Sequence, residues 1–252
     1  LENKDGTIRV QVNPVSEKVQ IIARVRAYTA GADSQAIAEA YLPTLFKVEE
    51  TAEMIRLVTE PGIRPDTVVM RVDYTVEVPQ HTDISIDVAN GNVWISEGCS
   101  NISVVGNNSD IEIIKPFGTV SAKTVNGRIS VLESAAETTL ETVNGSVQTS
   151  LAGGALQAST ITGNILASLL DEKVESCDLT SLNGSITLVM SDKISVDMNA
   201  ATECGLVRTD VTMEPWNGIK KRRQVYGRIG NGETPVSVNS MNGDIVIQRS
   251  AT

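Results

Sequence analysis

Hydrophobic and polar residues alternate on both sides of a recurring Asn-Gly pair over the last two-thirds of the chain. Two and four positions after the glycine, and five and seven positions before it, most residues are Val, Ile, Leu or Ala. The positions between them hold mostly Ser, Asp, Glu, Gln, Lys or Thr. Alternation of this kind is typical of strands with one buried face. The pattern therefore predicts two half-buried strands in each repeat, joined by a bend at Asn-Gly.

The repeat keeps a nearly regular period, which three columns of residues define. The anchor column holds Gly91, Ser109, Gly127, Gly145, Gly163, Gly184, Gly205 and Gly243, with steps of 18 residues up to Gly163, then 21 twice and 38 once. Just before it lie Asn90, Asn108, Asn126, Asn144, Asn183 and Asn242. Three positions before the anchor lie Thr124, Thr142, Thr160, Ser181, Thr202 and Ser240. Glycine supplies the positive φ that a tight bend requires, and stacked Asn side chains can hydrogen-bond along a stack.

Two architectures compete for this pattern. Asn-Gly between alternating runs is a strong signal for β-hairpins. A hairpin meander does not need matched columns at a fixed period, however, whereas stacked rungs place like residues above like. The left-handed hexapeptide helix is excluded, because Glu137 falls where its six-residue rule requires a small aliphatic residue. We therefore expect an all-β fold, a single-stranded parallel β-helix, and we expect it to be right-handed from the general preference of parallel β crossovers.

The expected domain organisation follows the extent of the repeat. Residues 84–252 are predicted to form the β-solenoid, with 18–21-residue rungs, an irregular loop at 215–230 and residues 236–247 as the closing rung. Residues 1–83 carry no Asn-Gly anchor, and we interpret them as a β-rich N-terminal cap continuous with the solenoid. The cap should contain one short helix over residues 35–41, with Asp33 or Ser34 as its N-cap. A cap fits because solenoids must cover their exposed ends.

The chain also resembles a known family. The segment VDYTVEVP at 72–79, the repeated Thr-Val-Asn-Gly at 124–127 and 142–145, and SMNGDI at 240–245 resemble the bacterial adhesin-like family of β-strand repeats, domain of unknown function 4097. The resemblance covers residues 19–247, and its specificity comes from short motifs repeated in register. It implies a single-stranded parallel β-helix and a role in the cell envelope or at the surface. It places no catalytic residue on this chain.

Composition narrows the classes of function. Only 3% of the residues are aromatic and there is one histidine, which suits a narrow core of short side chains. The net charge of −10 argues against nucleic acid as a partner and against electrostatic attachment to anionic membranes. No apolar run is long enough to cross a bilayer. No signal peptide is visible at Leu1. The abrupt start Leu-Glu-Asn-Lys-Asp leaves open whether the chain is a mature or trimmed piece of a longer protein.

The search for catalytic chemistry finds no assembled set of residues. A Gly-x-Ser-x-Gly elbow and a phosphate-binding loop are absent, and His81 lies in a turn where we expect it to be solvated. The odd number of cysteines (Cys99, Cys177 and Cys204), without any CxxC, signals neither zinc nor a disulfide framework. The Asn-Gly turns lack the aspartates of calcium-binding repeats. We therefore expect no catalytic residue, no cofactor and no metal.

The residues that break the repeat are the candidates for a contact surface. They are Trp94, Trp216, the basic run Lys220, Lys221, Arg222 and Arg223, and Tyr226. Trp94 should point outward from its rung. The ordinary interpretation is that the N-terminal cap covers its side chain there. The basic run is either an exposed loop or a contact for an acidic partner.

Three functions remain open from the sequence. The first hypothesis is a non-enzymatic, extracytoplasmic β-solenoid of the bacterial envelope or surface, adhesin-like, that contacts a protein or a glycan. The second is a β-helix enzyme acting on polysaccharide, which would need paired carboxylates; the outward acids Asp87, Glu112, Glu133 and Glu141 are scattered instead. The third is a cytoplasmic regulatory or assembly scaffold.

Overall fold

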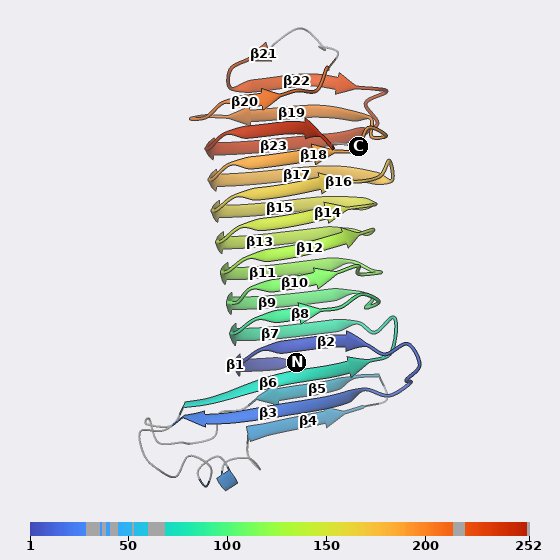
Figure 1. Ribbon diagram of the computed structural model, residues 1–252, viewed down its shortest axis with the longest axis vertical. Helices are drawn as coiled ribbons and strands as arrows, with labels where there is room; N and C mark the ends of the chain where they lie inside the picture. The colour runs from blue at the N-terminus through green and yellow to red at the C-terminus, as the bar shows by residue number, and fades with distance from the viewer. Residues whose placement is uncertain are drawn as a thin grey trace.

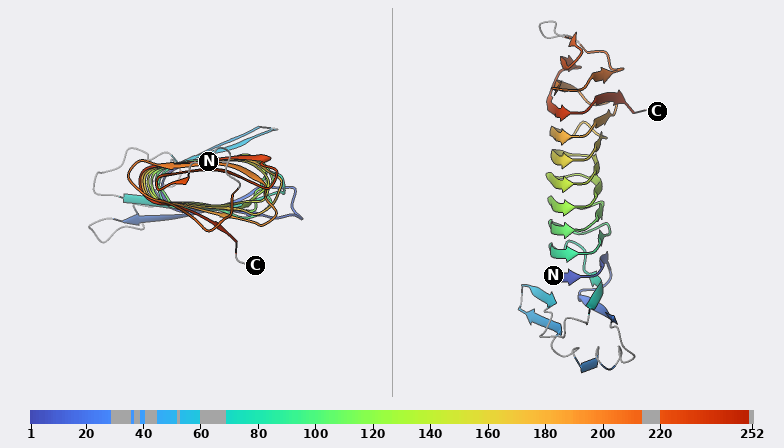
Figure 2. Two further views of the ribbon diagram at one scale, coloured as in Figure 1. Left: turned by 90° about the horizontal axis from the view of Figure 1, so that it is seen from above. Right: turned by 90° about the vertical axis from the view of Figure 1, so that its left-hand side faces the viewer.

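The protein is a tall, flattened stack of β-strands (Figures 1 and 2). The computed structural model describes residues 1–28, 36, 39–40, 45–51, 53–59, 69–213 and 220–250. The strands are β1 (Glu2–Asp5), β2 (Ile8–Val12), β3 (Gln20–Tyr28), β4 (Phe46–Glu50), β5 (Ile55–Thr59), β6 (Val69–Val78), β7 (Ile84–Asn90), β8 (Val93–Ile95), β9 (Ile102–Asn108), β10 (Ile111–Ile114), β11 (Val120–Asn126), β12 (Ile129–Ser134), β13 (Thr138–Asn144), β14 (Val147–Leu151), β15 (Gly154–Thr162), β16 (Ile165–Leu169), β17 (Val174–Asn183), β18 (Ile186–Met190), β19 (Val196–Thr202), β20 (Val207–Thr209), β21 (Lys220–Lys221), β22 (Gln224–Ile229), β23 (Thr234–Asn242) and β24 (Ile245–Arg249).

Two long sheets form the broad faces of the stack. Within the described residues, one has 13 strands in the order β21-β22-β19-β23-β17-β15-β13-β11-β9-β7-β1-β5-β4, and the other has 11 in the order β20-β24-β18-β16-β14-β12-β10-β8-β2-β6-β3. Successive rungs pair in parallel and in register, so that Thr124 lies opposite Thr142 and Asn126 opposite Asn144. This confirms the stacked-rung architecture and excludes the hairpin meander for these rungs. The right-handed coiling stays a prediction.

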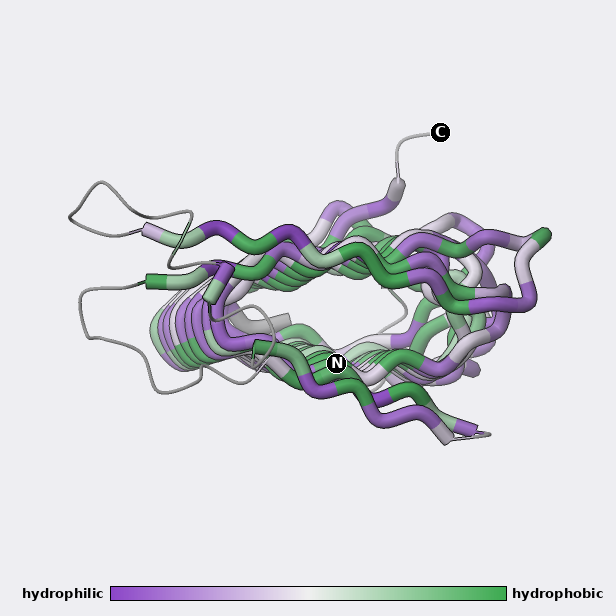
Figure 3. The backbone as a smooth tube through the Cα atoms, turned by 90° about the horizontal axis from the view of Figure 1, so that it is seen from below, coloured by the Kyte–Doolittle hydropathy of each residue, from purple (hydrophilic) through white to green (hydrophobic). Residues whose placement is uncertain are grey.

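The core is a narrow slab between the two sheets. Alternate residues of the strands in the stacked rungs point inward, and the tube view along the stack shows hydrophobic positions of successive rungs overlying one another (Figure 3). The column two positions after the anchor is almost fully buried, as in Val93, Ile111 and Ile129, each at most 1% exposed. Complete burial of such a side chain contributes about 1.5–3 kcal/mol. Four buried columns per rung therefore supply most of the stabilisation.

The first residues of the chain form a rung of the solenoid, which corrects the expected 1–83 cap. Strand β1 pairs in parallel with β7, so that Asp5 lies opposite Asn90, and β2 pairs in parallel with β8, so that Ile8 lies opposite Val93. Asp5-Gly6 therefore occupies the place of Asn90-Gly91. The N-terminus lies inside the stack rather than at its end (Figure 1).

The strands beyond this first rung close the N-terminal end. Strands β5 and β6 run parallel to β1 and β2, whereas β4 and β3 are added antiparallel on β5 and β6. Tyr74 fills the core here, is 2% exposed and shares a 2.6 Å hydrogen bond between its hydroxyl and Thr59 Oγ1. Burial raises the pKa of the Tyr74 phenol, with the Thr59 hydrogen bond opposing it. The predicted helix lies mostly outside the described residues, although residues 36, 39 and 40 are helical.

A charged cluster ties three of these N-terminal strands together. The Thr7 amide donates a 2.8 Å hydrogen bond to Asp73 Oδ1, and the guanidinium groups of Arg26 and Arg71 both pair with the same carboxylate. Burial pushes the pKa of Asp73 upward. The Thr7 amide and the two arginines outweigh it, so the pKa lies below its ordinary value. The Asp73 carboxylate therefore joins β6 to β3 and to the bend that leads into β2.

The C-terminal end departs from the expected rung order. Strand β23 lies between β17 and β19, with Cys177 and Met198 both opposite Val236. Strand β24 likewise lies between β18 and β20. The last rung of the sequence is therefore inserted one position inside the end, and the expectation that residues 236–247 close the stack is wrong. The expected irregular loop at 215–230 is also corrected, because β22 pairs antiparallel with β19 and β21 pairs with β22; residues 214–219 lie outside the described residues.

Side-chain hydrogen bonds run along the outer corner of the stack. Each Asn Nδ2 donates to the Asn Oδ1 of the rung toward the N-terminal end, from Asn108 to Asn90 at 2.8 Å, from Asn126 to Asn108 at 2.7 Å and from Asn144 to Asn126 at 3.0 Å. Asn242 donates to Asn183 at 2.9 Å in the same way. Thr162 stands between Asn144 and Asn183 and interrupts the series. These residues form what we call the Asn ladder.

Inside the same corner, hydroxyl groups bond to the backbone of the anchor column. Thr142 Oγ1 donates to the Gly127 carbonyl oxygen at 3.2 Å, and Thr160 Oγ1 donates to the Gly145 oxygen at 3.0 Å. Buried carbonyl groups of the bends thus gain partners that the sheets cannot supply. The regular spacing of Thr or Ser before the anchor within the repeat has this physical cause.

The anchor glycines, Gly91, Gly127, Gly145, Gly184 and Gly243 among them, allow the rungs to approach closely at the bend. A Cβ on Gly163 would lie 1.9 Å from the Gly145 carbonyl oxygen, and its φ of +151° is in the range that disfavours other residues. At Ser109 the column does carry a Cβ. There, Gly106 takes the place of the usual Thr or Ser, and a Cβ on Gly106 would lie 2.8 Å from Ser109 Cβ. Where the anchor column carries a Cβ, at Ser109, the Thr/Ser column therefore carries a glycine, at Gly106.

Candidate functional site

Trp94 lies in β8 on the outer face of the 11-stranded sheet and is partly exposed. Its neighbours in register are Arg9 of β2 and Glu112 of β10. The Arg9 guanidinium carbon lies 5.6 Å from the centre of the Trp94 ring, a cation–π contact. The residue that contacts the indole thus comes from the first rung, not from the strands that close the end.

The other predicted contact residues belong to the C-terminal end of the stack. Arg222 and Arg223 are exposed in the turn between β21 and β22, and Tyr226 is 41% exposed on β22. Lys220 and Lys221 form β21. Trp216 lies outside the described residues.

A shallow cavity of about 310 Å³ lies beside these arginines. Its lining comprises Cys204, Gly205, Leu206, Arg222, Arg223 and Asp244. The Arg222 and Arg223 carbonyl oxygens accept hydrogen bonds from the amides of Val207 and Thr202, both at 2.9 Å. Tyr226 is not part of this lining, so the structure does not bring the predicted contact residues into one site.

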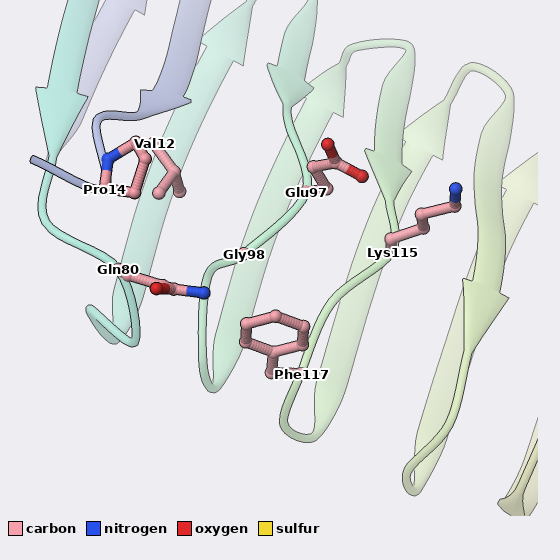
Figure 4. Close-up of a pocket in the computed structure, with 7 residues that line it drawn as sticks. All are labelled: Val12, Pro14, Gln80, Glu97, Gly98, Lys115 and Phe117. Carbon is pink, nitrogen blue, oxygen red and sulfur yellow. The ribbon is translucent and has the colours of Figure 1, made fainter.

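A second pocket, of about 270 Å³, lies at the edge of the stack opposite the Asn ladder, where the loops between rungs turn. It is lined by Val12, Pro14, Gln80, Glu97, Gly98, Lys115 and Phe117 (Figure 4). Phe117 is 52% exposed. The His81 ring lies against it, with 5.0 Å between the ring centres and 31° between the planes. The pocket thus combines one exposed aromatic ring with amide, carboxylate and ammonium groups.

The backbone around this pocket is bent into unusual conformations. Among the described residues, the non-glycine residues with positive φ are His81 at 62°, Lys115 at 46° and Glu133 at 55°. His81 supports the Phe117 ring, Lys115 lines the pocket, and Glu133 pairs with Lys115 at 3.5 Å. Such conformations cost about 1–3 kcal/mol each and cluster at functional sites. All three positions lie at the same edge of the stack as the pocket.

Sequence reasoning missed Phe117 and read His81 only as a solvated turn residue. His81 is exposed in its turn, and it also supports an aromatic ring. A signal for Phe117 was present. Phe117 follows Cys99 by one 18-residue period, yet Cys99 is buried and Phe117 is exposed. A large aromatic residue in a polar loop of a chain with so few aromatics marks a departure from the repeat.

The outward acids predicted to be scattered lie in different surroundings. Glu141 pairs with Lys123 at 3.0 Å and Glu133 with Lys115 at 3.5 Å. Asp87 lies opposite Glu2, whose carboxylate binds Arg56 at 2.7 Å. Two of the four acids are therefore neutralised by lysines rather than placed against a second acid.

Burial separates the three cysteines. Cys99 and Cys177 are buried, and Cys204 is exposed in the bend between β19 and β20. Burial raises the pKa of the Cys99 thiol to about 11. Burial, and then the charge of Asp178, raise the pKa of Cys177. The structure records all three as free thiols.

Groups of three or more His, Cys, Asp or Glu residues able to hold a metal ion do not occur in the described part of the chain. No helix in those residues is long and apolar enough to cross a membrane.

The fold defines a repeat protein, a two-sheet β-solenoid whose unusual features lie at its edges and ends. A model of the Toastrack family, DUF4097, matches residues 62–248. The chain belongs to this family, as the motifs of the repeat had suggested.

Two solved structures are similar to the chain. A putative adhesin from Bacteroides fragilis aligns with a TM-score of 0.48 and 12% sequence identity over 99% of this chain and 91% of that one. A putative cell adhesion protein from Clostridium sporogenes aligns with a TM-score of 0.25 and 12% identity over the same shares. No curated protein matches the sequence.

Proposed function

We propose that the protein is a non-enzymatic β-solenoid of the bacterial cell envelope or surface, which binds a partner through the edge of its stack. The observation that carries the proposal is the pocket around Phe117. There an exposed ring is held rigidly beside polar side chains on a stack whose backbone groups are paired rung by rung. Binding residues positioned by a rigid scaffold are typical of recognition proteins. The envelope location rests on the resemblance to adhesin-like β-strand repeats.

The absence of catalysis is part of the same proposal. Of the acids considered for polysaccharide chemistry, Glu133 and Glu141 each pair with a lysine. The two acids of a glycosidase must instead face one substrate bond. Incubation of the purified protein with neutral polysaccharides and polyuronides should release no new reducing ends. Turnover of any of them would favour the polysaccharide-acting enzyme instead.

The binding role is tested on whole cells. Antibody labelling and protease accessibility of intact bacteria should place the protein outside the cytoplasm. Cells that lack it should attach less well to a glycan-bearing surface than cells complemented with the gene. A protein found only in the cytoplasmic fraction, with unchanged attachment, would overturn the envelope proposal in favour of a cytoplasmic scaffold.

A further inference from the structure

The Phe117 ring is a fixed platform rather than a loose surface side chain. Its loop is tied to the loop of the preceding rung by a 2.8 Å hydrogen bond from the Phe117 amide to the Cys99 carbonyl oxygen. The His81 amide in turn donates to the Gly98 oxygen at 3.0 Å. The two loops therefore hold the rings of His81 and Phe117 together, and Phe117 remains half exposed. Little conformational entropy remains to be lost when a ligand covers this ring.

Three polar side chains line the pocket, those of Gln80, Glu97 and Lys115; in Figure 4 the Glu97 carboxylate and the Lys115 ammonium extend away from the Phe117 ring. The side chains of Gln80 and Glu97 are exposed and make no hydrogen bond or ion pair within the described part of the chain. Lys115 holds only the 3.5 Å ion pair with Glu133, which leaves ammonium hydrogens free. In Figure 4 the Gln80 amide extends toward the Phe117 ring. An amide, a carboxylate and an ammonium together can donate to and accept from several hydroxyl groups.

The size and charge of the pocket select among ligands. At about 270 Å³ it is smaller than common small-molecule pockets, which run from about 300 to 1,000 Å³. The pocket therefore suits a ligand that consists of a single ring. The lining holds one carboxylate, Glu97, and one ammonium, Lys115; Lys115 is already paired with Glu133 outside the lining, and the whole chain carries a net charge of −10. An anionic ligand is disfavoured on both counts.

We propose that this pocket binds one neutral hexopyranose unit of a glycan, an inference that rests on the proposed binding function. The apolar C–H face of the sugar stacks on Phe117, since aromatic faces attract positively polarised hydrogens. The hydroxyls hydrogen-bond to the Gln80 amide beside the ring, and to Glu97 and Lys115, whose exposed side chains turn toward the bound sugar. A flat ring with one apolar face and a polar rim matches this arrangement better than a fully apolar or a charged ligand.

The test measures binding of simple sugars to the whole chain. The probes are the methyl glycosides of glucose, galactose, mannose and N-acetylglucosamine, with methyl glucuronide as the anionic control. Saturation-transfer NMR and calorimetric titration are carried out on the wild type and on Phe117→Ala, Phe117→Trp and Ile161→Ala. Ile161 is the matched control, because it is exposed to a similar degree, 47%, on β15. Circular dichroism verifies the fold of each variant.

At least one neutral glycoside should bind, at millimolar concentration, more tightly than the glucuronide. Phe117→Ala should weaken it roughly tenfold or more, since a single stacking contact is worth about that factor. Phe117→Trp should retain binding, and Ile161→Ala should leave it unchanged. The proposal fails if none of the neutral glycosides binds the wild type, if the glucuronide binds best, or if folded Phe117→Ala binds as well as wild type.

The two proposals can fail separately. Surface location and attachment measured on cells do not depend on which ligand the pocket takes. If the protein is outside the cytoplasm and supports attachment while the neutral glycosides do not bind, the sugar pocket is wrong and the binding function stands. If the sugars bind but the protein is cytoplasmic, the envelope role is wrong.

Discussion

Substitution of one anchor glycine tests whether close stacking of the bends holds the solenoid together. In Gly163→Ala the new Cβ would lie 1.9 Å from the Gly145 carbonyl oxygen and 2.6 Å from its carbon. Both neighbours are backbone atoms of the adjacent rung, so no side chain can rotate away. The φ of +151° at Gly163 is also strained for alanine. The variant must therefore move two rungs apart at the bend.

Two costs add up in this variant. A residue held in a backbone region reserved for glycine costs about 1–3 kcal/mol. Overpacking against a fixed neighbour costs about 1–3 kcal/mol more. The movement also strains two hydrogen bonds, from the Gly163 amide to the Asn183 oxygen at 3.0 Å and from Ser181 Oγ to the Gly163 oxygen at 3.1 Å. We expect a loss of about 3–5 kcal/mol, out of the 5–15 kcal/mol typical of folded domains.

The assay is urea unfolding followed by far-UV circular dichroism. Because repeat arrays need not unfold in a single step, native-state hydrogen exchange of the amides in β15 to β18 is measured alongside it. The matched control is Ser109→Ala, at the one solenoid anchor of the sequence repeat that already carries a Cβ. Its buried hydroxyl has no partner in the described part of the chain, so its removal should be neutral or slightly stabilising.

A compensating change sharpens the test. The Gly106–Ser109 pair indicates that a Cβ at the anchor is accommodated when the residue three positions earlier is glycine. Gly163→Ser combined with Thr160→Gly should therefore be less destabilised than the sum of the two single changes. A Gly163→Ala variant within 1 kcal/mol of wild type would refute the close-stacking argument. Strict additivity in the Ser series would refute only the compensation inferred from Gly106 and Ser109.

Three further predictions concern other parts of the molecule. Thr162→Asn should extend the Asn ladder through the rung that interrupts it and raise the free energy of unfolding by about 0.5–1.5 kcal/mol; an unchanged value in urea would count against the ladder as a source of stability. Asp73→Asn should lower the free energy of unfolding at neutral pH by about 1 kcal/mol after allowance for solvent screening. Because the pKa of Asp73 is held below its ordinary value of 3.8, the wild-type advantage should be complete above pH 3.8 and fade as the pH falls further; thermal melts that show a pH-independent difference would contradict this. Ellman's reagent should titrate one thiol in the native protein, Cys204, and reach Cys99 and Cys177 only in denaturant; a Cys204→Ser variant with a fast-reacting thiol would overturn the assignment.

The stacked rungs could be predicted because each one repeats the same physical solution. Inward residues in four columns, an Asn at the outer corner and a Thr or Ser inside it recur at a fixed spacing. Register follows from such repetition, since a one-residue slip would turn every buried side chain to solvent. Residues such as Ile129 and Asn126 therefore lie where their columns place them.

The rung at the start of the chain was missed because its bend reads Asp5-Gly6 instead of Asn-Gly. The apolar columns were nevertheless present, with Ile8 and Val10 two and four positions after Gly6. Asn90 Nδ2 donates to Asp5 Oδ1 at 2.9 Å, so that the aspartate continues the Asn ladder. A carboxylate accepts this hydrogen bond as an amide oxygen does, and it needs no donor because Asp5 begins the series.

The Phe117 pocket could not be predicted from the sequence for a different reason. Loops between rungs carry no periodic constraint on which side chains meet. The contact between His81 and Phe117 joins residues 36 positions apart in two separate loops. Their proximity depends on rung stacking and on the positive φ of His81, neither of which a single loop sequence encodes.

The first and the last rung of the sequence both lie one position inside the stack. The outermost rung of a solenoid has a neighbour on one side only and is the first to fray. Here the first rung, β1–β2, lies between β5–β6 and β7–β8, and the last rung, β23–β24, lies between β17–β18 and β19–β20. Each terminal segment is therefore paired on both sides.

The outer positions are left to strands from within the chain, and antiparallel β3, β4 and β22 cover edges that would otherwise offer open hydrogen-bonding groups. This arrangement explains the 38-residue step between Gly205 and Gly243. The chain forms the outer rung β19–β20, turns back through β22 and then returns to form β23 one position inside.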